Sequence, residues 1–127
     1  MSAADIWRQR LRADLVAAMK ARDPVAVAAL RSAISAIDNA EAVAVPDGGA
    51  PALAGAIAGA AAGVGSTEVA RRDLAPDEVR GVVQMLIDDW EGAAAWSRGH
   101  GLPERAERLG REAAVLRAFV AGISDMA

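Results

Sequence analysis

The stretch that decides the fold runs from Met19 to Glu41 and reads MKARDPVAVAALRSAISAIDNAE. Asp23 and Pro24 predict a helix start, because an aspartate can cap the first free N–H groups and a proline at the first helical position loses no hydrogen bond. We therefore predict that one helix ends just before Asp23 and that the next begins there, in a tight antiparallel hairpin. The second helix carries an apolar stripe at helical spacing, made of Val27, Leu30, Ile34 and Ile37.

A first helix is expected ahead of that turn, over residues 3–22. Ser2 can cap its N-terminus, and Asp5 three residues later completes a capping box. Arg8 and Arg12 are expected to lie away from its apolar face. That face is expected to hold Trp7, Leu11, Leu15 and Ala18, with Ile6 and Met19 beside them. Near the end of the second helix, Glu41 continues the apolar stripe, so we expect it to pair with an arginine of a neighbouring helix.

Two further helices are predicted in the second half of the chain. One begins at Pro76 and ends near Gly99, and the next begins at Pro103. Their apolar residues alternate in steps of four and three, the spacing of long helices that pack side by side. We therefore predict an all-α fold, an up-and-down helical bundle of two helical hairpins, with Trp90 buried between the last two helices. The two stripes are Val79, Val83, Leu86, Trp90 and Ala93, and Leu102, Ala106, Leu109, Ala113, Leu116 and Val120.

The hairpins are joined by a long Ala/Gly-rich connection, residues 48–67, which reads GGAPALAGAIAGAAAGVGST and carries no charge. Gly55, Gly59 and Gly63 have the four-residue spacing of membrane helix pairs, but few large apolar residues support insertion into a membrane. The GVGST end lacks the lysine of a phosphate-binding loop. We interpret the segment as an insert draped over the helices, and residues 1–127 as one domain.

Composition limits the classes of function that the chain can have. The chain contains no cysteine, which excludes thiolate sites. Its net charge is −3, whereas a dedicated nucleic-acid binder has a basic excess. The N-terminus is charged where a secretory signal would be apolar, which indicates a cytoplasmic protein, with no membrane as a partner. His100, the single histidine, has Ser97 nearby but no orienting acid. We therefore expect no catalytic residues, no metal site and no cofactor.

The hairpin sequence resembles the opening of GatB/YqeY proteins. In that family a basic–acidic turn precedes a helix that reads Leu-Arg, then small and apolar residues, then Asn-Ala-Glu. The stretches 74–79, 102–107 and 112–116 resemble the family's third and fourth helices. The chain differs in its acidic third helix, and we expect it to lack the small C-terminal helical domain of typical members. The matching residues of the hairpin are Lys20, Arg22, Asp23, Leu30, Arg31, Ala36, Ile37, Asn39, Ala40 and Glu41.

The resemblance implies a non-catalytic YqeY-like module that binds tRNA or a protein partner, since the family includes the tRNA-holding tail domain of amidotransferase B subunits. The contact would use the basic residues of the first hairpin and those before the third helix, namely Lys20, Arg22, Arg31, Arg71 and Arg72. Three alternatives stay open. In the first, these residues are only solvated charges. In the second, the protein is an accessory to glutamine-dependent amidotransfer, with the carbon–nitrogen ligase chemistry in another subunit, and in the third it is a structural homo-oligomerisation domain.

Overall fold

The computed structural model describes residues 1–42 and 71–125, and within these ranges the chain forms four helices and no strand. The helices are α1 (Ala3–Lys20), α2 (Pro24–Glu41), α5 (Pro76–Gly99) and α6 (Pro103–Asp125). The predicted all-α fold of two helical hairpins is confirmed. The Ala/Gly-rich connection, with its three competing interpretations, lies outside the described residues.

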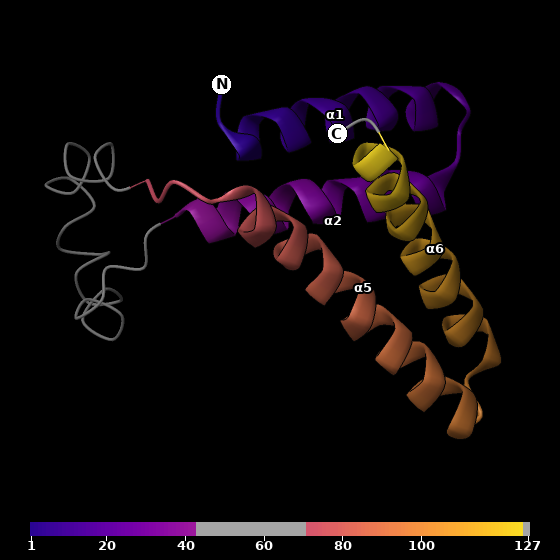
Figure 1. The fold of residues 1–127 in the computed structure, drawn as a ribbon. Helices are drawn as coiled ribbons and strands as arrows, with labels where there is room; N and C mark the ends of the chain where they lie inside the picture. The colour runs from indigo at the N-terminus through magenta and orange to yellow at the C-terminus, as the bar shows by residue number, and fades with distance from the viewer. Residues whose placement is uncertain (43–70, 126–127) are drawn as a thin grey trace, which may run out of the picture.

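The two hairpins meet at an angle (Figure 1). Helices α1 and α2 run antiparallel, and α5 and α6 form the second hairpin, which crosses the first obliquely and carries its connecting end away from it. The joint between the hairpins is made where the start of α5 and the second half of α6 pack against α2 and α1. One end of the second hairpin is therefore part of the shared core, whereas its tip packs only on itself.

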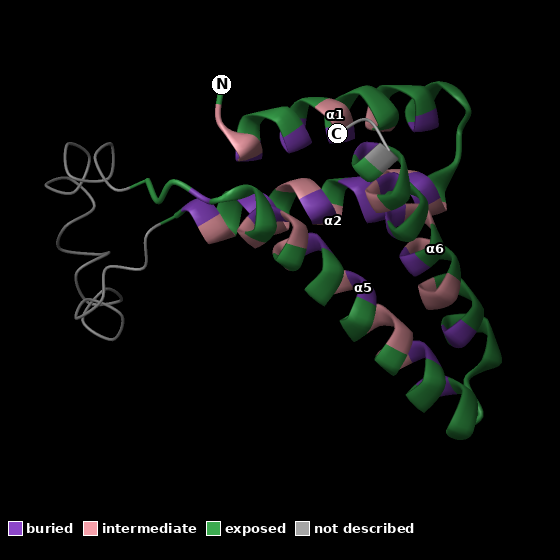
Figure 2. Ribbon diagram, in the orientation of Figure 1, coloured by how far each residue is buried: buried purple, intermediate pink, exposed green. Residues whose placement is uncertain are grey.

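The core lies at this joint, where buried residues of all four helices gather (Figure 2). The indole of Trp7 packs edge-on against the ring of Phe119, with 5.7 Å between ring centroids. Burying these large apolar surfaces supplies the main stabilisation of the fold, since helices of this length do not persist alone. The largest core members are Trp7, Leu11, Leu30, Ile37, Val79, Val83, Ile87, Leu116, Phe119 and Ile123.

The predicted stripe of α5 is wrong in its second half. The structure buries Ile87, Ala94 and Ser97, while Leu86 and Trp90 are only partly buried beside the core. Steps of four and three average less than the 3.6 residues of a helical turn, so such a stripe drifts around a long straight helix. On α1, Ile6 and Met19 are exposed rather than part of the apolar face.

The helix starts follow the predicted capping chemistry. Ser2 and Asp5 form the full capping box of α1, and the Asp23 side chain accepts from the N–H of Ala26 at 3.1 Å. At α5 the cap position is Ala75, which has no side-chain acceptor, and only the Glu78 carboxylate reaches back to the Ala75 N–H at 3.0 Å. Local polar residues thus set where each of these helices begins.

The end of α2 lies beside the segment that leads into α5. Ala42 and Arg71 form an isolated antiparallel bridge, and the N–H of Arg72 donates to the carbonyl of Glu41 at 2.7 Å. The end of α2 and the approach to α5 are therefore held together directly by backbone hydrogen bonds.

Candidate functional site

The turn of the first hairpin is built by three residues between α1 and α2. The N–H of Asp23 donates to the carbonyl of Ala18 at 3.0 Å, and the N–H of Arg22 donates to Met19 at 3.1 Å, which closes the end of α1. Arg22 has φ of 55°, the left-handed conformation in which glycine is the usual residue. The turn therefore places a charged side chain at a position that its backbone geometry disfavours.

Unpaired positive charge collects on this hairpin. Lys20, Arg22 and Arg31 are exposed, and no ion pair joins any of them to another described residue. The carboxylate of Asp23, the acid at the turn, accepts a hydrogen bond that caps α2. Arg31 follows on α2, about 10 Å along the helix from Pro24 by its rise per residue. The turn and the first half of α2 can therefore present cations to an anionic partner.

An apolar hollow lies beside these cations. It has a volume of about 460 Å³ and is lined by Met19, Arg22, Asp23, Pro24 and Val27. Met19 at its edge is 51% exposed. The turn thus combines positive charge with a small apolar surface that a partner can cover.

Arg71 and Arg72 do not join this cluster. They lie next to the C-terminal end of α2, whereas Lys20 and Arg22 lie at its N-terminal end, and 18 helical residues span about 27 Å. Both are also engaged, since Arg71 is 3.6 Å from a carboxylate oxygen of Glu41 and Arg72 pairs with Glu78. The five predicted residues therefore divide into two groups. Lys20, Arg22 and Arg31, at the turn and in the first half of α2, have no ion pair with a described residue, whereas Arg71 and Arg72 are paired at the far end of α2.

The sequence interpretation missed Arg8, which is 7% exposed rather than solvated. Its Nε donates to Asp38 at 3.0 Å, one Nη donates to Asp5 at 3.0 Å, and the other pairs with buried Glu41. Burial works against the charge of Arg8, but the Glu41 and Asp38 carboxylates more than offset it and raise its pKa. The expectation that Glu41 pairs with an arginine from another helix is confirmed.

Counting residues outward from the hairpin turn predicts this cluster around Arg8. In an antiparallel pair of helices, residues at similar distances before and after the turn lie at the same level, which places Arg8 near Asp38 and Glu41. The two acids are three residues apart and so share one face of α2. The network is closed: every guanidinium nitrogen has a carboxylate partner. It therefore joins α1 to α2 rather than offering a ligand site.

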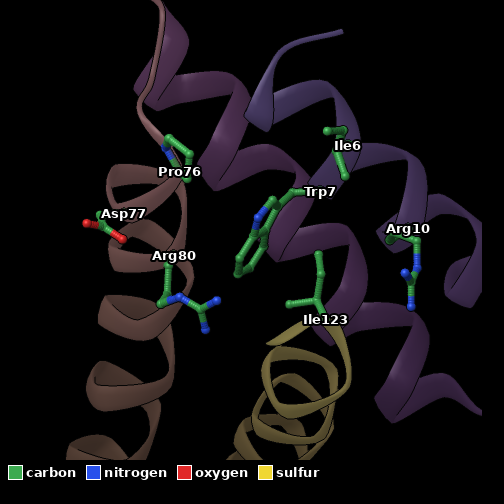
Figure 3. A pocket seen from close by; sticks show the side chains of 7 residues that line it. All are labelled: Ile6, Trp7, Arg10, Pro76, Asp77, Arg80 and Ile123. Atoms are coloured by element: carbon green, nitrogen blue, oxygen red, sulfur yellow. The ribbon is translucent and has the colours of Figure 1, made fainter. Parts of the chain in front are cut away.

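A shallow cleft lies where α1, α5 and α6 meet (Figure 3). It has a volume of about 390 Å³, and Trp7 and Ile123 form its floor. Arg80 extends toward them from α5; its guanidinium lies 5.5 Å from the Trp7 ring centroid and donates to Ser124 Oγ at 2.6 Å. Arg80 therefore ties the three helices together by a cation–π contact and a hydrogen bond, and we assign the cleft a structural role.

Ser97 and His100 do not form a catalytic pair. Ser97, on α5, is fully buried, and its Oγ has no hydrogen-bond partner among the residues that the structure describes. The exposed His100 instead stacks on Trp96, with ring centroids 4.0 Å apart, and its Nδ1 lies 2.7 Å from the Trp96 carbonyl. The histidine ring thus covers the indole at the hairpin tip and is turned away from the serine.

Within residues 1–42 and 71–125, no group of three His, Cys, Asp or Glu residues is arranged to hold a metal ion, and no helix has the length and apolar content needed to span a membrane. No protein-family model, no curated protein and no solved structure matches the chain.

Proposed function

We propose that the protein is a non-catalytic, YqeY-like helical module of the cytoplasm that binds tRNA through the turn of its first hairpin. The observation that carries the proposal is the group of exposed cations at the turn and in the first half of α2, Lys20, Arg22 and Arg31, which have no acidic partner among the described residues. Phosphate groups take such side chains as direct partners, and a module with so few of them binds weakly and in a salt-dependent way.

The backbone of Arg22 supports the same proposal. A side chain in the left-handed region costs free energy that glycine would not, and such strained residues concentrate at functional positions. The chain uses glycine at the corresponding point of its second hairpin, where Gly101 has φ of 74°. An arginine at the first turn is consistent with a requirement for its charge.

Charge reversal at the turn tests the proposal. We expect Lys20→Glu with Arg22→Glu to lower tRNA affinity about tenfold or more at low salt, because two phosphate contacts become repulsive. Affinity of the unchanged protein should fall as salt rises. Fluorescence anisotropy with labelled tRNA measures both effects.

A matched control is available at the tip of the second hairpin. Arg98 and Arg105 are also exposed and also lack an ion pair with any described residue, so Arg98→Glu with Arg105→Glu makes the same change in net charge. Affinity per chain should stay near that of the unchanged protein. Equal losses in the two variants would mean that overall charge, and not the turn, governs binding.

The apolar hollow favours a second candidate, a protein partner at the same turn. In that case this chain would be an accessory to glutamine-dependent amidotransfer, and the partner would supply the carbon–nitrogen ligase chemistry as another subunit. Met19, Pro24 and Val27 give the hollow the apolar lining that protein contacts use. Binding to a purified amidotransferase that is lost on Met19→Asp, together with no tRNA binding, would favour this candidate over the first.

A further inference from the structure

The floor of the cleft between α1, α5 and α6 holds a polar group that the fold leaves unpaired (Figure 3). Trp7 is only 6% exposed, and the described residues provide no hydrogen-bond acceptor for its indole N–H. The edge of the ring that carries the nitrogen faces the cleft, toward the start of α5. A buried tryptophan usually has a partner for this N–H, so an unpaired donor at the cleft floor indicates an acceptor from outside the chain.

Arg80 brings positive charge to the same cleft. It forms no ion pair with any described residue. One of its nitrogens donates to Ser124 Oγ at 2.6 Å, which leaves other N–H groups of the guanidinium for a further acceptor. The guanidinium lies 5.5 Å from the centroid of the Trp7 ring, so its charge and the indole N–H are neighbours. Together they suit an acceptor that carries negative charge.

The remaining lining of the cleft is mostly apolar. Ile6, Pro76 and Ile123 form its walls and floor, and Ile6 remains 45% exposed. Asp77 lies at the rim, where its carboxylate points to the outer side of α5, away from Trp7. An occupant with one negative charge is therefore favoured over one with two. The volume of about 390 Å³ is in the lower range of sites for small molecules.

We propose that this cleft binds a small monocarboxylate with an apolar body. One carboxylate oxygen accepts from the Trp7 N–H and the other from the Arg80 guanidinium, while the body of the ligand covers Ile6 and Ile123. The structural role of Arg80 is kept, because the ligand uses N–H groups that Ser124 does not. The cleft is distinct from the turn of the first hairpin, so this proposal does not depend on tRNA binding.

Proton–nitrogen correlation NMR on the full chain tests the proposal, with phenylacetate as the probe. The chain has three tryptophans, and the indole N–H signal that disappears in Trp7→Phe is that of Trp7. We expect phenylacetate at millimolar concentration to shift the Trp7 signal in a saturable way and to leave the Trp96 signal in place.

Two comparison compounds separate charge from shape. Phenylacetamide has the shape of the probe without its charge, and inorganic phosphate has charge without an apolar body. Each should bind at least about tenfold more weakly than phenylacetate, because each lacks one of the two interactions that the cleft offers. Equal binding of either compound overturns the proposal, as does a Trp7 signal that phenylacetate leaves unchanged.

A pair of variants separates ligand binding from the structural role of Arg80. Arg80→Gln should weaken phenylacetate binding at least about tenfold, because it removes the cation. Ser124→Ala is the matched control: it removes the hydrogen bond that Arg80 makes within the fold but no donor to the ligand, so its affinity should equal that of the unchanged protein. Circular dichroism should show unchanged helicity in both variants. A folded Arg80→Gln protein that binds as tightly as the unchanged protein contradicts the proposal.

Discussion

At the scale of single residues, Arg8 contributes most to the joining of α1 and α2. Its guanidinium meets three carboxylates, of which Glu41 is itself 8% exposed. Removing the cation leaves the charge of Glu41 nearly buried, with only the longer contact to Arg71 to offset it. The network thus depends on a residue that the sequence pattern places on the solvent side.

We expect Arg8→Met to lower the free energy of unfolding by about 2 kcal/mol, less than the loss typical of a fully buried pair because Asp5 and Asp38 are half exposed. Urea denaturation followed by circular dichroism measures the change. Arg12→Met is the matched control, since Arg12 is exposed on the same helix, and it should alter stability by less than about 0.5 kcal/mol. Equal stability of the two variants would contradict a stabilising role for the network.

The contrast between Arg8 and Glu41 shows what a single helix pattern can and cannot predict. The position of Glu41 on the apolar stripe of α2 correctly indicated an arginine partner. The apolar pattern of α1 alone predicts that Arg8 lies on the solvent side, since arginine is seldom buried unless it is paired. Arg8 is buried by its contacts with the opposing helix α2, so its burial can be predicted only when the sequences of both helices are considered together.

At the scale of elements, the helix starts were predictable and the facing of α5 was not. Ser2, Asp23 and the prolines at 24, 76 and 103 act within one turn of chain, so their effect depends little on tertiary contacts. Which residues of α5 are buried depends on the angle at which the two hairpins cross. Trp90 is consequently only partly buried, whereas Trp7, at the joint, packs against Phe119.

The candidate site shows the same division. Lys20, Arg22 and Arg31 were predicted from the turn and from α2, where spacing along the chain fixes their neighbourhood. Arg71 and Arg72 were grouped with them by charge, but the antiparallel course of the chain carries these two to the opposite end of α2. Long-range placement needs the packing of helices, which the sequence of one segment does not contain.

At the scale of the whole molecule, two points far apart in the sequence, the end of α2 and the approach to α5, lie side by side. The Ala42–Arg71 bridge and the Arg72–Glu41 hydrogen bond hold these points together. We therefore expect a variant in which a short Gly/Ser linker replaces residues 43–70 to keep its helices and its melting temperature within a few degrees, because closing a shorter loop costs less entropy. Circular dichroism melts measure this. A large loss of stability would show that the replaced residues contribute to the core.

Overall charge and local charge also differ at this scale. The chain carries a net −3, yet Lys20, Arg22 and Arg31 form no ion pair with any described residue, and neither do Asp88 and Asp89 on α5. An anionic partner is therefore expected to approach the first hairpin, with α5 directed away from it.

If Arg22 occupies an unfavourable turn position because its charge binds tRNA, the substitution Arg22→Gly should separate its effect on stability from its effect on binding. Glycine relieves the left-handed backbone, so we expect stability to rise by about 1 kcal/mol while tRNA affinity falls. The measurement is a tRNA titration at low salt, paired with a urea denaturation of the same two proteins. A more stable Arg22→Gly protein with weakened binding is the predicted result. Unchanged tRNA affinity in that variant, or no tRNA binding by the unchanged protein at low salt, would show that the charge of Arg22 does not bind tRNA.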